Sequence, residues 1–243
     1  MACLHAVGRG VRTLVAVTVL AGSALYIVGG TVTGSAHAEI TKPTPIDILF
    51  ERKHLTNVVA GTELVYRFDR TVTQPELLGQ PFSDDIKVEI KKVEPNGTRA
   101  VVVKVFTGER ARDPQPIDEL TGNPVLVVFL DRAVASYMAV AGGKVAYLKD
   151  KFRTALRERA TVTPVKVKLA DKVTDAYKIS VQPYAGDLNA QKMRGYENSS
   201  FSFVVSEAVP GQFVELVSIY ENNAKDAPRL EERMLMVGAE VLP

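Results

Sequence analysis

The feature that most constrains the fold is the alternation of apolar and polar residues through much of the chain. Segment 85–91 places Ile86, Val88 and Ile90 on one face and charged residues on the other. A period of two is typical of a strand with one face on a core and one in water, as antiparallel sheets allow. The same alternation predicts strands at 62–69, 85–91, 99–107, 165–169, 177–181, 201–206, 212–220 and 229–237.

Three further segments complete the predicted fold. The run 124–130 is apolar on both faces and predicts a buried strand, whereas apolar residues at helical spacing predict helices at 131–141 and 145–159. Parallel strands need long crossovers, and most successive strands here are joined by short segments. The predicted fold class is therefore α+β, mainly β: a curved, partly closed antiparallel sheet or half-barrel of about nine strands with an inserted helix pair.

The N-terminal segment 1–38 has the three parts of a secretory signal. Arg9 and Arg12 precede the uncharged stretch 13–28, and Ala36-His37-Ala38 supplies small residues for cleavage after Ala38. We expect a periplasmic protein whose mature part, 39–243, is a single β-rich domain. The uncharged stretch approaches the length of a membrane span, so an uncleaved anchor stays open as the one route to membrane contact.

Removal of this signal would remove the cysteine and two of the three histidines. Cys3 is the only cysteine, and His54 is the one histidine of three that remains. This excludes disulfides, thiol chemistry and zinc sites with several His or Cys ligands, and we expect no cofactor. Of 30 basic residues, 28 remain against 28 acids, because Arg9 and Arg12 leave with the signal. That balance argues against nucleic acid as a partner.

Catalytic residues are not identifiable from motifs. His54 lies in a charged patch, Glu51-Arg52-Lys53-His54, and is expected to be a solvated surface side chain. Neighbouring acids occur at Asp84-Asp85, Asp118-Glu119 and Glu231-Glu232. Adjacent residues on a regular strand point to opposite faces, so such a pair cannot converge on one bond. A carboxylate-dependent hydrolase, which needs two acids facing each other, stays open as the third functional hypothesis.

Two long polar loops are candidate recognition elements. Loop 108–123 carries Arg110 and Arg112, which suit a carboxylate or phosphate ligand, although pairing with acids of the same loop is the interpretation we favour. In loop 183–199 the candidates are Tyr184, Arg194 and Tyr196, although the tyrosines could simply cover the end of the barrel. The second functional hypothesis is therefore a structural or assembly factor of the cell envelope that acts through these loops.

The second predicted helix carries a row of cations along its sequence. They could contact anionic lipid headgroups or a partner, but a solvated face of an amphipathic helix is the interpretation we favour. The row consists of Lys149, Lys151, Arg153, Arg157 and Arg159.

The closing segment consists of a strand ending in Val-Ser, a turn ending in Pro-Gly, and a return strand with an internal acid. These parts are Phe201 to Ser206, Val209-Pro210-Gly211, and Phe213 to Leu216. Together with the meander and the helix pair, it resembles the open-barrel proteins of Gram-negative periplasms, which include the lipoprotein-carrier type and uncharacterised exported families. The resemblance implies a concave apolar surface that could hold an acyl chain or apolar peptide.

The leading functional hypothesis is an exported, non-enzymatic binding protein for an apolar ligand or an envelope component. Its partner would be an apolar small molecule or an envelope protein. The candidate ligand-binding residues, which could instead be plain core, are Tyr66, Phe68, Met138, Phe152 and Phe203. A hollow of roughly 300 Å³ or more between the second helix and the sheet would favour a carrier.

Overall fold

A computed structural model describes residues 43–243, which belong to one compact unit. The predicted signal, its cleavage site and the first residues of the mature chain lie outside the described residues.

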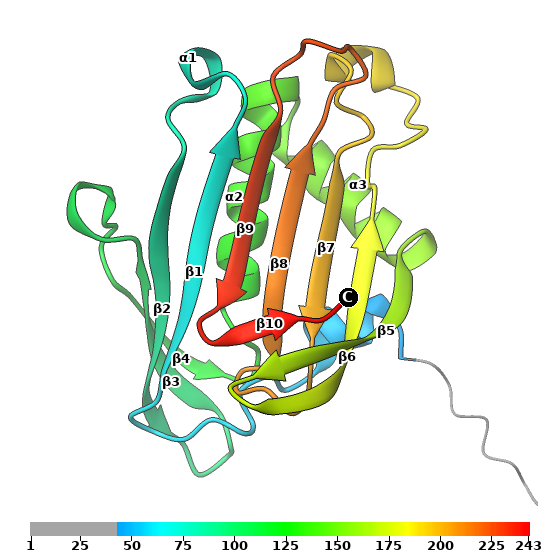
Figure 1. Cartoon of the computed structure of the whole chain (residues 1–243). Coiled ribbons are helices and arrows are strands. Elements are labelled where there is room, and N and C mark those ends of the chain that lie inside the picture. The colour runs from blue at the N-terminus through cyan, green and yellow to red at the C-terminus, as the bar shows by residue number, and fades with distance from the viewer. Residues whose placement is uncertain (1–42) are drawn as a thin grey trace, which may run out of the picture. The chain divides into compact units, whose positions relative to one another are not determined.

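Ten strands form one antiparallel sheet in the order β10-β5-β6-β7-β8-β9-β1-β2-β3-β4. Their bounds are β1 Glu63–Val72, β2 Phe82–Val93, β3 Arg99–Val105, β4 Gln115–Leu120, β5 Thr161–Leu169, β6 Lys172–Val181, β7 Ser200–Val205, β8 Phe213–Tyr220, β9 Leu230–Met236 and β10 Ala239–Val241. The sheet is open, with β10 and β4 as its edges (Figure 1). This confirms the predicted fold class.

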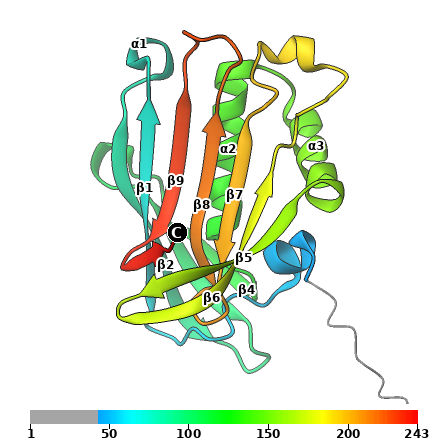
Figure 2. The same cartoon turned by 45° about the vertical axis from the view of Figure 1, so that its right-hand side comes forward.

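Two long helices, α2 (Val125–Ala141) and α3 (Val145–Glu158), lie on the same side of the sheet (Figures 1 and 2). The shorter helical segments are η1 Asp47–Glu51, α1 Pro75–Leu78, η2 Gly108–Arg110 and η3 Ala190–Met193. Within residues 43–243 no single helix has the length and apolarity to cross a bilayer; α2 and α3 meet that criterion only jointly, as a pair bent by 116°.

The alternation in the sequence matches the burial of the strands. Every second residue of β2 from Asp84 to Ile90 is buried, as is every second residue of β3 and of β9. The hairpin between β2 and β3 turns at Asn96-Gly97, where the Asn96 side chain accepts a hydrogen bond from the Thr98 amide at 3.0 Å. Gly97 there has a φ of 85°, which glycine adopts without strain.

The strand predicted at 124–130 is wrong, because these residues form the first half of α2. An entirely apolar run has no periodicity that separates a buried strand from a buried helix. The start of the helix is set by Asn123, whose side-chain oxygen accepts the Val125 amide at 3.1 Å. Asn123 also donates to the Tyr66 hydroxyl at 2.8 Å and to the Gly211 carbonyl at 2.9 Å. These contacts fasten the start of α2 to β1 and to the turn before β8.

The prediction of a loop over 108–123 is also wrong in part, because η2 and β4 lie within it. Both strands that the sequence missed, β4 and β10, are short edge strands of six and three residues. Pro116 lies within β4, and an edge strand tolerates proline because one side of it needs no hydrogen-bond donor. Residues 115–120 are mostly exposed, so they carry no alternation of apolar and polar residues.

The buried core includes residues of both helices and of strands β1 to β3 and β6 to β9, and next to β7 it is filled by aromatic rings. Phe129 of α2 packs edge-on against Phe203 with ring centroids 5.5 Å apart. Phe152 of α3 meets Phe201 at 5.1 Å in the same geometry. Such aromatic pairs bury large areas in preferred orientations. This part of the space between α3 and the sheet is therefore packed, and open space lies on either side of α2.

Candidate functional site

The larger cavity, which we term the α2/β4 groove, has a volume of about 780 Å³ and lies between α2 and strands β3 and β4. One end is bounded by Leu49 and Phe50 of η1. Most of its wall is aliphatic: Val103, Val105, Ile117, Leu120, Leu126 and Val128.

The groove exists because α2 presents small side chains to β3 and β4. Ala135 and Ala139, one helical turn apart, both line it and are both exposed. The inward face of β3 presents Val103 and Val105, and β4 adds Ile117, whose Cα pairs with that of Val101. Interiors are normally filled to crystal-like density, so alanine at these two positions leaves space that a larger residue would fill.

Polar groups lie at the rim and on the floor of the groove. Arg112, Asp113 and Gln115 stand on the β4 side, and Asp131 stands on α2. The floor includes Arg132 and Ser136. This is the pattern of a ligand site: a mainly apolar wall with a few polar groups that fix orientation.

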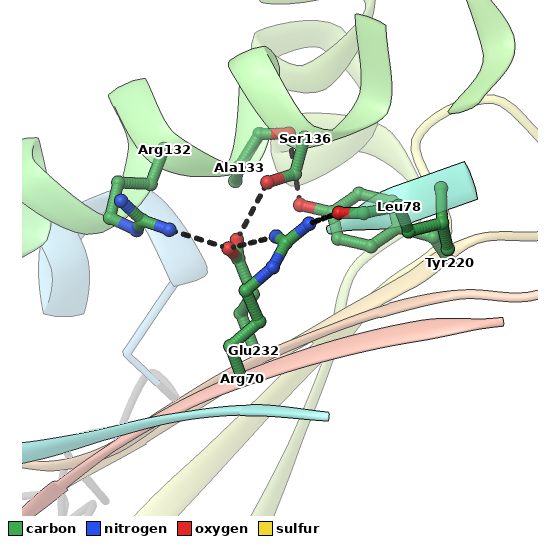
Figure 3. Close-up of polar contacts among 7 residues, drawn as sticks. All are labelled: Arg70, Leu78, Arg132, Ala133, Ser136, Tyr220 and Glu232. Carbon is green, nitrogen blue, oxygen red and sulfur yellow. Dashed lines mark hydrogen bonds and ion pairs between the residues drawn. The ribbon is translucent and has the colours of Figure 1, made fainter. Parts of the chain in front are cut away.

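The floor is held by a buried carboxylate, Glu232 of β9, which is 1% exposed (Figure 3). Its Oε1 lies 2.8 Å from Nη1 of Arg70 and 2.7 Å from Nη2 of Arg132, and its Oε2 accepts the Ser136 hydroxyl at 2.9 Å. Arg70 also donates to the Leu78 carbonyl at 2.7 Å. The cluster ties α2 to β1 and β9, because a buried charge must be paired and hydrogen-bonded to be tolerated.

Two guanidinium groups share this one carboxylate, so the cluster carries a net positive charge. The side chain of Arg132 is 15% exposed, and its buried Nε has no hydrogen-bond partner among the described residues. Its guanidinium carbon lies 4.4 Å from the ring centroid of Phe68 and 5.0 Å from that of Phe106. Cation–π contact of this kind stabilises a partly desolvated arginine.

Tyr220 closes the cluster from the sheet side. Its hydroxyl donates to the Ala133 carbonyl at 2.9 Å. Burial, and after it the negative charge of Glu232, holds the pKa of Tyr220 well above its ordinary value. The phenol therefore stays a neutral donor.

The acids at the groove do not form a free pair. Glu232 is bonded as described, and Asp131 pairs with Lys149 at 3.0 Å. Asp113 is the remaining acid of the described lining, so a second free carboxylate, which a glycosidase mechanism requires, is missing from that lining. Glu231, the sequence neighbour of Glu232, pairs instead with Arg229 at 2.8 Å, as expected for opposite faces of a strand.

His54 is buried, at 1% exposure, so the prediction of a solvated surface side chain is wrong. Its Nε2 is 2.8 Å from the Ile48 carbonyl, and its ring packs 4.7 Å from that of Phe213. Burial lowers the pKa of His54, with a smaller contribution from the charge of Arg52. The neutral imidazole thus donates to Ile48 and fixes η1 at the end of the groove. Within the described part of the chain, no cluster of three or more His, Cys, Asp or Glu side chains could hold a metal.

The smaller cavity, which we term the α2/α3 cavity, has a volume of about 360 Å³ and lies between the two helices and η1. Its wall includes Val134 of α2, Leu156 of α3 and Tyr184. Phe50, Val127 and Asp131 line both cavities. Phe50 and Val127 are 48% and 60% exposed, so they form an apolar ridge between the two.

Four of the five predicted ligand-binding residues line neither cavity. Tyr66, Phe68 and Phe203 are fully buried, and Met138 packs against the core. Phe152 alone lines the α2/α3 cavity. Contact of these residues with a ligand stays a prediction.

Loop 183–199 is fastened to α3. Asp187 accepts the Tyr147 hydroxyl at 2.5 Å and pairs with Lys151 at 3.0 Å. Tyr184 and Tyr196 are buried, at 1% and 4% exposure, and the Tyr196 hydroxyl donates to the Pro228 carbonyl at 2.7 Å. Both tyrosines are thus buried, Tyr184 lines the α2/α3 cavity, and a role of either in recognition stays a prediction.

The three predicted recognition arginines lie in three different places. Arg112 lines the groove, and Arg110 stacks on Phe82 with its guanidinium carbon 4.7 Å from the ring centroid. Arg194 is exposed in loop 183–199 with a φ of 53°. A role of these arginines in recognition stays a prediction.

Sequence reasoning missed the groove and the Glu232 cluster. A signal for the cluster was present: Glu232 occupies an inward position between Leu230 and Met234, and Arg70 continues the inward positions of Tyr66 and Phe68. The Cα atoms of Arg70 and Glu232 are direct cross-strand partners. A charged residue in an apolar register on each of two strands indicates a buried pair.

No protein-family model and no curated protein matches the chain. A solved structure of a LolA superfamily protein from Nitrosomonas europaea is similar at a TM-score of 0.19 and 12% identity, over 82% of this chain and 94% of that one. A likeness of this degree is too weak to assign a fold or a function.

Proposed function

We propose that the protein is an exported, non-enzymatic binding protein that takes an apolar ligand in the α2/β4 groove. The observation that carries the proposal is the hollow itself: about 780 Å³ with aliphatic walls on two sides. Ligand pockets span roughly 300 to 1,000 Å³ and are mostly apolar with few polar groups. The proposal includes export to the periplasm, which the features of segment 1–38 support.

Binding in the groove is driven by removal of apolar surface from water. An alkyl chain laid along Val103, Val105 and Ile117 would gain ~0.8 kcal/mol for each methylene buried. The side chains of Ala135 and Ala139 leave room for it on the α2 side. Arg132 and Ser136, held by Glu232, offer a fixed polar point on the floor.

The neutral fluorescent probe N-phenyl-1-naphthylamine tests the proposal. We expect saturable binding to the wild-type protein and binding at least ~10-fold weaker in Ala135→Trp, because an indole placed in the groove overlaps the ligand. The matched control is Ala146→Trp, an exposed alanine of α3 that lines neither cavity. Equal binding by the two variants would contradict the assignment of the groove.

An assembly factor that acts through the loops has one supporting observation. Residues 107–116 are exposed without interruption and include Arg110 and Arg112, of which Arg112 stands at the groove rim. Crosslinking in intact cells would test this candidate. Deletion should be limited to 108–114, because β4 begins at Gln115 and removing a strand would unfold the edge of the sheet.

A further inference from the structure

The row of cations on α3 divides into two groups. Three of the five have partners within the fold: Lys149 pairs with Asp131, Lys151 pairs with Asp187, and Arg159 donates to the carbonyls of Pro183 and Ala185. These three contacts join α3 to α2 and to loop 183–199.

Arg153 and Arg157 differ from the other three. Both are exposed, and neither has an ion pair or hydrogen bond to another residue in the described range 43–243. They stand four residues apart and therefore on the same face of α3. Both line the α2/α3 cavity, so two unpaired guanidinium groups stand at the mouth of an apolar hollow.

The interior of that cavity suits a hydrocarbon chain. Phe152, Leu156 and Phe201 line it together with Val134 and Tyr184. The only acid of the described lining is Asp131, which is already paired with Lys149 at 3.0 Å. Counting the lining charges, Lys149, Arg153 and Arg157 against Asp131 leave a surplus of two positive charges at the mouth.

We propose that the α2/α3 cavity is a second binding site, for an amphiphile with an anionic headgroup. The hydrocarbon chain enters between α2 and α3, and the headgroup, a carboxylate or a phosphate monoester, is held by Arg153 and Arg157. Guanidinium groups form bidentate, charge-assisted hydrogen bonds with both kinds of anion. The site adjoins the α2/β4 groove and shares Phe50, Val127 and Asp131 with it, whereas Arg153, Arg157 and Phe152 line this site and not the groove.

The charge requirement is tested with cis-parinaric acid and its uncharged methyl ester. Both are titrated into Ala135→Trp, in which the groove is obstructed, and into the wild-type protein. We expect the acid to bind ~10-fold more tightly than the ester, and the difference to shrink as salt rises. In Arg153→Gln/Arg157→Gln the preference for the acid should disappear while the ester binds as before.

The matched control is Lys172→Gln/Lys192→Gln. It removes the same amount of charge from two exposed lysines that line neither cavity. This control should keep the preference for the acid. All four substituted positions are exposed, and thermal melting of each variant verifies that it folds.

Displacement separates the possible headgroups. Oleate and lysophosphatidic acid compete for bound parinaric acid if carboxylate and phosphate monoester both fit, whereas inorganic phosphate, which lacks a chain, should not compete. A preference for the acid that survives in the arginine variant would overturn the proposal. A second result would also overturn it: equal affinity for acid and ester, together with cosedimentation on anionic phosphatidylglycerol vesicles that depends on the two arginines. This face would then be a membrane-docking surface.

Failure of the second-site proposal can be distinguished from failure of the groove proposal. If the groove binds nothing, Ala135→Trp matches the wild type with the neutral probe, but the arginine pair still governs the acid. If the second site is wrong, Ala135→Trp still loses the neutral probe and the arginine variant behaves as the wild type.

Discussion

The two sides of α2 show how side-chain volume decides between core and cavity. Towards β7 and β8, α2 presents Phe129 and Tyr137, which pack against Phe203 and Tyr220. Towards β3 and β4 it presents Ala135 and Ala139, and a groove of about 780 Å³ remains. The sheet faces α2 with apolar residues on both sides, so the difference arises on the helix. The first side is filled by aromatic rings, and the second keeps open space above Arg132 and Ser136.

Truncation on the packed side should have the largest effect. Phe129→Ala removes a fully buried ring from between α2 and β7, and we expect a loss of ~3–5 kcal/mol in the free energy of unfolding. Urea denaturation followed by circular dichroism measures it. A loss below that of a typical surface substitution would mean that this side of α2 is not packed as described.

The next largest effect is expected at Glu232, the buried carboxylate that joins α2 to β1 and β9. Glu232→Gln leaves Arg70 and Arg132 without their carboxylate, and removal of one partner from a buried pair costs ~3 kcal/mol or more. Glu231→Gln on the opposite face should stay within ~0.5 kcal/mol of the wild type, since its pair with Arg229 is partly exposed. Similar losses for the two variants would contradict the buried position of Glu232.

A smaller, pH-dependent effect is expected at η1, where the groove ends. Burial lowers the pKa of His54 in the folded state, so the unfolded chain binds more protons once the pH falls below the ordinary histidine value of 6.5. The contribution of His54 to stability is therefore unimpaired above that pH and declines below it. In His54→Gln the midpoint of urea unfolding should fall less between pH 7 and pH 5 than in the wild type. An equal fall in both proteins would remove His54 as the cause.

The smallest effect is expected on the open side. Ala139→Leu places a larger side chain in the groove without displacing any packed neighbour, so its stability should stay within ~0.5 kcal/mol of the wild type. Its uptake of the neutral probe should nonetheless be reduced. Unchanged uptake would show that the ligand lies elsewhere.

Most of the strands were predictable because one-sided burial imposes a period of two. Where the sequence is apolar throughout or mostly polar, the period vanishes. Segment 124–130 is apolar even at exposed Val127 and forms a helix, and segment 115–120 is mostly exposed and forms an edge strand. The lack of space for any side chain at Gly211 could not be inferred from the sequence either. A Cβ there would lie 2.6 Å from Leu64 and 2.8 Å from Asn123, contacts that exist only once β1, α2 and β8 are assembled.

The site was less predictable than the fold because its contacts are distant in sequence. Glu232 meets Arg70 across 162 positions and Arg132 across 100. His54 stands in a charged stretch, yet its burial depends on Phe213. Periodicity reports how one segment meets a core; it carries no information on which other segment supplies the partner.

A crystal structure of the protein with a bound apolar molecule, such as methyl palmitate, tests the central claim most directly. The account predicts an alkyl chain between α2 and strands β3 and β4, in contact with Ala135, Val103 and Ile117. A groove that holds no chain, whether or not a chain is bound in the α2/α3 cavity, or a groove closed by β4 resting against α2, would contradict it.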